Sequence, residues 1–404
     1  MNKVNILAPA GNWESLMAAI NAGTDEIYFG IGELNMRAAG ANNFEINDLE
    51  KIAKLCQEKD IKTWVTLNTV VYDEEIEVIK KSLAEIKKAR IDGIIAADLA
   101  VIKEANSLGI EVCASTQMSV SNLETVKILS KWVDRIVLAR ELNLEQIKNI
   151  VEGVKKEKIV GPKGNLIEIE VFGHGAMCVA MSGRCQMSLY HYNLSANRGK
   201  CVQVCRRKYE VKDKDTGKEL MLDNDWVMSR SDLCTIGLLE KLVETGIKTI
   251  KIEGRARSAD YVDTVIKTYK KGLQLIGENN FGKKEKEELL KELKTVFNRG
   301  FSSGFYMGRT TDEWASGENN LATETKKLLG QIEHFYQKIN VVEIKLNKDD
   351  RVNNGDEYII IGPSTGVYRD KFFEIKMEKE TLTFKTKQRV RKNDKLFLVV
   401  KNEN

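Results

Sequence analysis

The chain has 404 residues, of which 42% are hydrophobic and 30% are charged, and its formal net charge at pH 7 is only +4. This composition is typical of a soluble globular protein with room for two domains, and it excludes a disordered or fibrous chain. With so small a net charge, the chain as a whole does not attract nucleic acid. Local basic runs such as CRRKYEVKDK are either phosphate-binding patches or solvated helix faces. No run approaches the roughly 18–20 apolar residues of a membrane span, so we expect a cytoplasmic protein without one.

Apolar runs and helical patterns alternate through the first two thirds of the chain. Eight runs have the length and the β-branched content of strands: residues 5–10, 26–30, 62–68, 93–98, 111–119, 135–140, 167–173 and 249–255. Helical patterns follow them: residues 12–23, 46–60, 73–89, 100–109, 122–133, 143–154, 233–246 and 259–276. The sequence therefore predicts eight strand–helix units in succession.

Strict alternation of strands and helices implies a parallel sheet, and eight units match a (β/α)8 TIM-like barrel in number and length. The alternative is a doubly wound open sheet. Its G-x-G-x-x-G fingerprint is missing, because APAGNWES has a single glycine where the first helix opens. We predict a barrel domain over residues 1–280, with an insertion over about 172–234 that leaves the seventh strand.

The composition changes after residue 280. A helical linker is expected over residues 281–334, and short apolar runs separated by polar turns follow it. This pattern predicts a small antiparallel all-β domain, a barrel or a sandwich, over residues 335–404.

Polar residues end several of the predicted barrel strands, where the active sites of such barrels lie. Arg140 and Arg255 are candidates to bind an anionic substrate, or alternatively belong to an ion-pair ring at the rim. Glu253, Asp98 and His174 are candidates to move protons, although a lone histidine is often structural.

Five of the seven cysteines fall within 57 positions: Cys178, Cys185, Cys201, Cys205 and Cys234. In a reducing compartment an odd number of cysteines favours metal binding or redox chemistry over a disulfide framework. The spacing favours a four-thiolate iron–sulfur cluster over zinc, whose ligands usually come in tight pairs, and over unrelated thiols. Cys56 and Cys113 lie inside helical and strand patterns, so we expect both in the core.

Long motifs in a fixed order resemble one family. The segments EVFGHGAMCVAMSGRCQMS, NRGKCVQVCRRKY, SDLC and KIEGRARSADYV are similar to successive signature blocks of the collagenase-like peptidase family U32. The opening LAPAGNWESLMAAINAGTDEIYFG and the later NRGFSSGFYMG agree as well, so the resemblance covers essentially the whole chain. It is closest to the tRNA hydroxylation type of this family.

The resemblance implies an iron–sulfur protein for oxygen-independent hydroxylation. The implied reaction is 5-hydroxyuridine formation at the tRNA wobble position with prephenate as co-substrate, while relatives that act on ribosomal RNA or in ubiquinone synthesis leave other substrates open. The expected partner is the tRNA anticodon loop, with a homologous subunit or a second copy as further partners.

The resemblance also implies roles for particular residues. Cys178, Cys185, Cys201 and Cys234 match the family's ligands of a cluster, expected to be [4Fe–4S], and Cys205 is an alternative to one of them. Arg140 and Arg255 would bind the carboxylates of a prephenate-like co-substrate. His174, Glu253 or Asp98 would transfer protons.

Two other functions remain open. The family name implies a collagenase-like protease, but H-E-x-x-H and G-x-S-x-G are missing, and Cys178 with His174 is the conceivable dyad. The third hypothesis is a cluster-bearing subunit without catalysis of its own.

Overall fold

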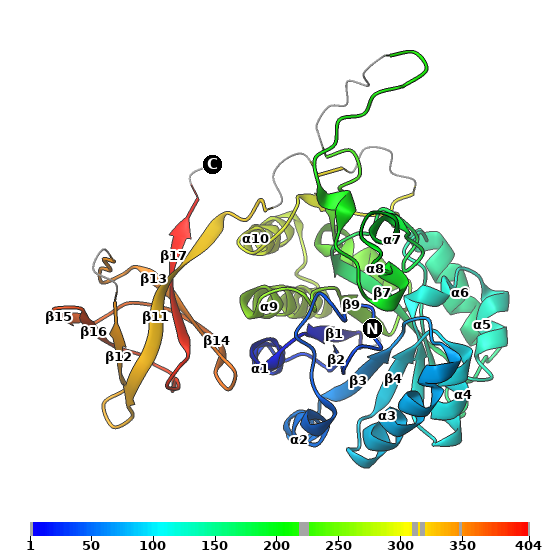
Figure 1. Ribbon diagram of the computed structural model, residues 1–404, viewed down its shortest axis with the longest axis horizontal. Helices are drawn as coiled ribbons and strands as arrows, with labels where there is room; N and C mark the ends of the chain where they lie inside the picture. The colour runs from blue at the N-terminus through cyan, green and yellow to red at the C-terminus, as the bar shows by residue number, and fades with distance from the viewer. Residues whose placement is uncertain (1–2, 218–225, 309–313, 316–319, 347–349, 403–404) are drawn as a thin grey trace.

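The computed structural model describes the chain except residues 1–2, 218–225, 309–313, 316–319, 347–349 and 403–404. Figure 1 shows a large α/β body and a smaller all-β body made by the C-terminal strands. Each body has its own hydrophobic core. None of the described helices is long and apolar enough to cross a membrane.

Eight parallel strands close the α/β body into a barrel. Strands β1 to β7 pair in chain order, and β9 pairs with both β7 and β1, which completes the ring. The strands are β1 (Asn5–Ala10), β2 (Glu26–Gly30), β3 (Lys62–Leu67), β4 (Gly93–Ala96), β5 (Glu111–Ala114), β6 (Arg135–Val137), β7 (Glu168–Gly175) and β9 (Thr249–Ile252). The predicted (β/α)8 TIM-like barrel is confirmed.

Amphipathic helices cover the outside of this barrel (Figure 1). They are α1 (Trp13–Asn21), α2 (Leu49–Gln57), α3 (Ile76–Lys88), α4 (Leu99–Ser107), α5 (Leu123–Leu129), α6 (Leu144–Lys156), α8 (Leu239–Glu244) and α9 (Ala259–Gly277). Side chains that accept from backbone amides begin four of them: Asn12, Asp98, Asn122 and Asn143. Cys56 and Cys113 are both fully buried, which confirms their expected place in the core.

Short 3-10 helices stand between the longer elements. They are η1 (Ile46–Asp48), η2 (Asp73–Glu75), η3 (Thr116–Met118), η4 (Ala196–Arg198), η5 (Val204–Arg206) and η6 (Ile236–Leu238).

Paired charges fill the barrel interior near the amino ends of its strands. Arg135 donates to Glu26 and to Glu168, in each case at 2.6 Å, and Lys251 donates to Glu170 at 3.1 Å. Charges of opposite sign compensate one another's burial here. The network fills this end of the barrel, so the opposite end, where the strands stop, is left for a site.

The insertion begins after β7 and ends at β8 (Asp232–Cys234). Strand β8 runs antiparallel to β7, where His174 pairs with Cys234, and β10 (Phe301–Ser302) pairs with β8 in parallel. The insertion carries α7 (Met187–Tyr192), η4 and η5. It starts at the carboxyl end of a barrel strand, so it lies over the mouth of the barrel, as its place in the sequence predicts.

The all-β body is one antiparallel sheet in the order β14-β13-β17-β11-β12-β16-β15. Its strands follow α10 (Lys283–Lys294): β11 (Glu324–Tyr336), β12 (Val341–Lys345), β13 (Glu357–Gly362), β14 (Gly366–Lys371), β15 (Lys376–Glu378), β16 (Thr381–Lys385) and β17 (Lys395–Lys401). Strand β11 occupies the last part of the segment 281–334, which the sequence pattern predicts to be a helical linker. Two register shifts let this one long strand pair first with β17 and then with β12.

The two bodies meet where β14 lies against α1 and α9. Ala18 and Ala259 pack with Val367 in a small apolar cluster, and Asn21 Nδ2 donates to the Thr365 carbonyl at 3.0 Å. Gly366 has φ +68°, and a Cβ there would lie 2.9 Å from Ala18 N, so a glycine is needed for this approach. The all-β body is therefore attached to outer helices of the barrel.

Candidate functional site

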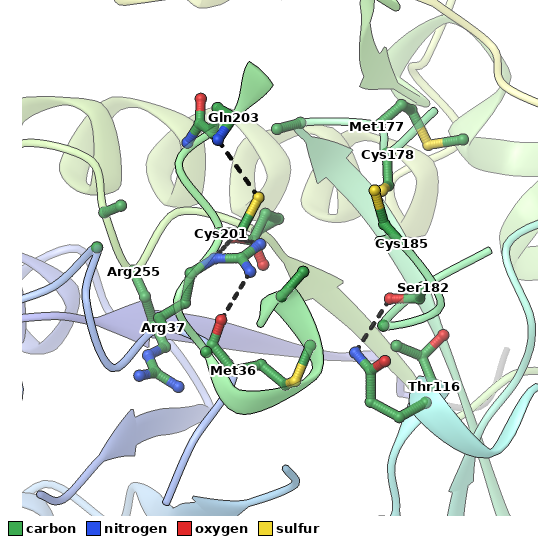
Figure 2. A pocket seen from close by; sticks show the side chains of 18 of the residues that line it. Met36, Arg37, Thr116, Met177, Cys178, Ser182, Cys185, Cys201, Gln203 and Arg255 are labelled. Carbon is green, nitrogen blue, oxygen red and sulfur yellow. Dashed lines mark hydrogen bonds and ion pairs between the residues drawn. The ribbon is translucent and has the colours of Figure 1, made fainter. Parts of the chain in front are cut away.

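A pocket of about 220 Å³ opens where the barrel strands end and the insertion covers them (Figure 2). Its described lining carries a single carboxylate, Glu253, among seven cationic side chains: Arg37, Arg140, Arg206, Lys251, Arg255, Arg257 and Arg299. Lys251 is paired with Glu170, and Arg257 and Arg299 are paired with Asp232, but the remaining positive charge in a partly enclosed space attracts anions. The pocket therefore suits a carboxylate or phosphate ligand.

Glu253, just after β9, is the centre of this charge arrangement. It accepts from Arg37 Nε at 3.1 Å and from Arg37 Nη2 at 2.9 Å. Burial by itself raises the pKa of Glu253, but Arg37, Arg140 and Arg255 outweigh burial and hold this pKa below its usual value. The carboxylate is therefore ionised at neutral pH.

Arg140 and Arg255 both line the pocket, as their positions at strand ends predict. Arg255 donates to Thr66 Oγ1 at 2.7 Å and to Asn43 Oδ1 at 2.7 Å, and burial lowers its pKa to about 10. Arg140 donates to the Ala176 carbonyl at 3.0 Å and lies over the Phe172 ring.

Both guanidinium groups keep unused donors. Nε and Nη2 of Arg140 and Nε of Arg255 are buried and have no hydrogen-bond partner in the part of the chain that the structure describes. Buried donors of this kind are normally satisfied by a side chain, a water or a ligand.

Four cysteines line the same pocket: Cys178, Cys185, Cys201 and Cys205. Figure 2 shows Cys201 across the pocket from Cys178 and Cys185. Burial raises the pKa of the Cys205 thiol, and the neighbouring thiols of Cys178, Cys201 and Cys185 raise it further. Three of the predicted ligands and Cys205 therefore line one pocket.

Thiols are the donors that iron–sulfur clusters use, so the chemistry of this lining is compatible with such a cluster. Four thiols share one pocket, but no group of three His, Cys, Asp or Glu side chains among the described residues stands ready to hold one metal ion. Gln203 N and Ser188 Oγ lie 3.4 and 3.9 Å from Cys201 Sγ, and such donors stabilise sulfur that carries negative charge. All seven cysteines are free thiols.

Cys234 lies elsewhere. It is 8% exposed, it is absent from the pocket lining, and Tyr269 Oη lies 4.0 Å from its sulfur. Burial raises its pKa to about 11. Strand β8 places Cys234 beside β7, outside the lining that the other four cysteines share, so Cys205 and Cys234 are alternatives for the fourth ligand.

His174 and Asp98 also lie outside the main pocket. His174 is 1% exposed among Tyr261, Tyr269 and Phe301, and burial, followed by the charge of Arg257, lowers its pKa to about 3. It is a neutral buried histidine. Asp98 caps α4 by accepting from Ala100 N at 2.9 Å, and it lines a second, adjoining cavity.

Comparison with known proteins gives the family. The sequence model of Peptidase family U32 matches residues 11–316, which is most of the chain. The chain belongs to peptidase family U32. Proteins with different names are relatives of this U32 chain, so membership alone does not fix an activity.

Three relatives illustrate the range of the U32 family. A protein named collagenase from Porphyromonas gingivalis is 43% identical over 100% of this chain and 99% of its own length. The tRNA hydroxylation protein P1 of Bacillus subtilis is 33% identical over 89% of this chain and 84% of its own length. A 23S rRNA 5-hydroxycytidine synthase of Escherichia coli is 32% identical over 68% of this chain and 40% of its own length.

Arg37 lines the pocket of this U32 chain without any local sequence signal, whereas Gln117 is among the polar residues that end the predicted barrel strands. Arg37 stands in the loop after β2, in the glycine-rich segment FGIGELNMRAAG, which has no helical or strand pattern. Gln117 follows β5 in STQM, and its place at a strand end was the available signal.

Proposed function

We propose that this chain is an RNA-modifying enzyme that hydroxylates a pyrimidine without molecular oxygen, forming 5-hydroxyuridine at the tRNA wobble position. The observation that carries the proposal is the place of the four thiols, which line the same pocket as the unused guanidinium donors. Relatives named for tRNA and rRNA hydroxylation share this fold family and support an RNA substrate. The [4Fe–4S] cluster, the use of prephenate and the wobble uridine are all parts of the proposal.

The cationic pocket would hold a small co-substrate with two carboxylates, such as prephenate. Arg140 has two unused donors on one guanidinium face, the arrangement that binds a carboxylate in a bidentate way. Arg255 offers Nε for the second carboxylate. Glu253 holds Arg37 in place and repels a ligand that does not match these cations.

Cys178, Cys185, Cys201 and Cys205 would hold the cluster, which supplies electron transfer when bound. The chain's own residues would position the reactants. Glu253 is ionised at the pocket wall, but its lowered pKa makes it a weak base, so its part is to position Arg37. His174 is neutral and buried, so a catalytic role for it is not part of the proposal.

The insertion presents a surface that suits single-stranded RNA. Tyr190 on α7 is 87% exposed, and Tyr192 is 44% exposed with Arg207 over its ring. Lys200 is exposed in the same insertion. Exposed aromatic rings beside basic residues stack on bases and contact phosphates, and this surface borders the pocket.

The test is nucleoside analysis of tRNA from a strain that lacks its own uridine hydroxylation and carries this single gene. We expect 5-hydroxyuridine with the wild-type gene and its loss with Cys185→Ala. Met181→Ala is the matched control, because Met181 lies in the same loop, is 44% exposed and contributes no thiol. Full hydroxylation by Cys185→Ala would refute the proposal, and a requirement for a second gene would favour the subunit hypothesis.

Proteolysis is the second candidate, since a relative with 43% identity is named collagenase. A cysteine peptidase needs a base next to its thiol, and no histidine is among the described residues that line the pocket. Purified protein should therefore leave denatured collagen intact. Cleavage that Cys178→Ala abolishes would establish the peptidase instead.

A further inference from the structure

A second cavity of about 230 Å³ adjoins the main pocket. The two share five lining residues, Met36, Asn68, Gln117, Ser182 and Gly183. We call the second cavity the side pocket. Its volume is several times the roughly 30 Å³ that one water occupies in the liquid, so a ring-sized group fits.

Three residues that line the side pocket carry buried oxygens without a hydrogen-bond partner in the described part of the chain: Thr69 Oγ1, Gln117 Oε1 and Asn197 Oδ1. They come from three different segments, after β3, in η3 and in η4. Thr69 is only 2% exposed. Buried oxygens without partners cost free energy, so a water or a ligand normally satisfies them, and three at one cavity make it a candidate binding site.

The surrounding contacts fix Gln117. Its Nε2 donates to Ser182 Oγ at 3.1 Å, which leaves the carbonyl oxygen as the free end of the amide. Gly183 has φ +78°, and a Cβ there would lie 2.0 Å from Gln117 Oε1. A side chain at position 183 would collide with this oxygen, so the position requires glycine.

Charge separates the two cavities. The main pocket is lined by seven cations, whereas the side pocket is lined mainly by amide, hydroxyl and apolar side chains, with Asp98 and the exposed Arg184 as its charged members. The main pocket suits an anion. The side pocket suits an uncharged ring that offers hydrogen-bond donors and acceptors along one edge.

We propose that the side pocket binds the Watson–Crick edge of the pyrimidine base that is modified, which rests on the proposed RNA substrate. Gln117 Oε1 or Asn197 Oδ1 would accept from N3–H of a uracil, or both would accept from the N4 amino group of a cytosine, and Thr69 Oγ1 would donate to a ring carbonyl. In a pyrimidine, C5 and C6 lie on the opposite ring edge from N3. A base held by its N3 edge therefore keeps C5 and C6 on the edge that faces away from these three residues.

The experiment measures the affinity of the full chain for a tRNA anticodon stem-loop with uridine, cytidine or an abasic site at the wobble position. Thr69→Val removes the hydroxyl and nearly keeps the shape of the side chain, and Gln117→Leu removes the amide. Each variant should bind the uridine or cytidine stem-loop roughly fivefold to tenfold more weakly, the effect of one lost hydrogen bond. Binding of the abasic stem-loop should stay unchanged.

Three controls separate base recognition from folding. Thr69→Ser keeps the hydroxyl and should keep the affinity. Thr69→Val should leave the melting temperature unchanged or raise it, because the hydroxyl that it removes has no partner. Gln274→Leu changes an exposed glutamine on α9 and should have no effect.

The pattern of results distinguishes this inference from the proposed function. A stronger effect with uridine than with cytidine would support the side pocket and identify its base, and the reverse preference would support it with cytidine as the base. Equal binding of base-bearing and abasic stem-loops by the wild-type chain would overturn the inference, while cysteine-dependent hydroxylation in the cell would still stand.

Discussion

Glu253 accepts two hydrogen bonds from the guanidinium group of Arg37, 216 positions away in the sequence. The pair joins the loop after β2 to the end of β9 at the mouth of the barrel. It keeps a carboxylate ionised among seven cations, so it sets both the charge and the shape of the anion pocket.

Breaking this pair should destabilise the chain. Glu253→Gln removes the charge and leaves Arg37 without its ionic partner, which we expect to cost about 1–2 kcal/mol because the carboxylate is largely buried while Arg37 is 37% exposed. Urea denaturation measures the change. Glu77→Gln, which breaks an exposed helix pair with Lys80, is the matched control and should give no measurable loss.

Removing Arg140 should separate binding from stability. Arg140→Gln deletes two buried donors without partners but also the hydrogen bond to the Ala176 carbonyl and the contact with the Phe172 ring, so these opposing effects should leave the melting temperature little changed while binding of a dicarboxylate such as prephenate falls by at least roughly tenfold. Calorimetric titration measures the affinity. Arg389→Gln, on the exposed surface of the all-β body, should bind like the wild type. If Arg140→Gln binds the dicarboxylate with the affinity of the wild type, Arg140 does not contribute to binding it.

The cysteines should divide into two classes. Cys205→Ala should lower the iron and sulfide content of protein purified without oxygen, because Cys205 lies with the other three pocket thiols. Cys234→Ala should keep its iron and lose roughly 1 kcal/mol of stability, the cost of a small cavity. Iron lost in Cys234→Ala but kept in Cys205→Ala would return the fourth ligand to Cys234.

His174 should make the fold sensitive to acid. Its pKa is about 3 in the folded chain, against about 6.5 for an unperturbed histidine, so the unfolded state binds a proton first as the pH falls. The free energy of unfolding should therefore fall between about pH 6.5 and pH 3, by up to about 1.4 kcal/mol for each pH unit from this group.

The measurement for His174 is the slope of unfolding free energy against pH. His174→Gln should flatten this slope below about pH 6.5, whereas His191→Gln, at an exposed histidine, should keep it. An unchanged slope in His174→Gln would mean that the histidine is protonated in the folded chain.

The sequence determined the barrel, because eight apolar runs and eight amphipathic patterns report local burial that each segment carries in its own residues. It also determined where the functional residues gather. Arg140, Arg255 and Glu253 stand at strand ends, and the carboxyl ends of parallel barrel strands must meet at one mouth. These conclusions depend on local pattern and on a general rule of topology.

The tertiary structure decided which of those residues meet. Five cysteines lie in one stretch of the sequence, but the antiparallel return of β8 buries Cys234 while the loop around η5 brings Cys205 to the pocket. The sequence likewise could not predict that Glu253 pairs with Arg37 or that a side pocket forms around Gln117. Each depends on contacts between segments far apart in the chain, and no local pattern encodes such contacts.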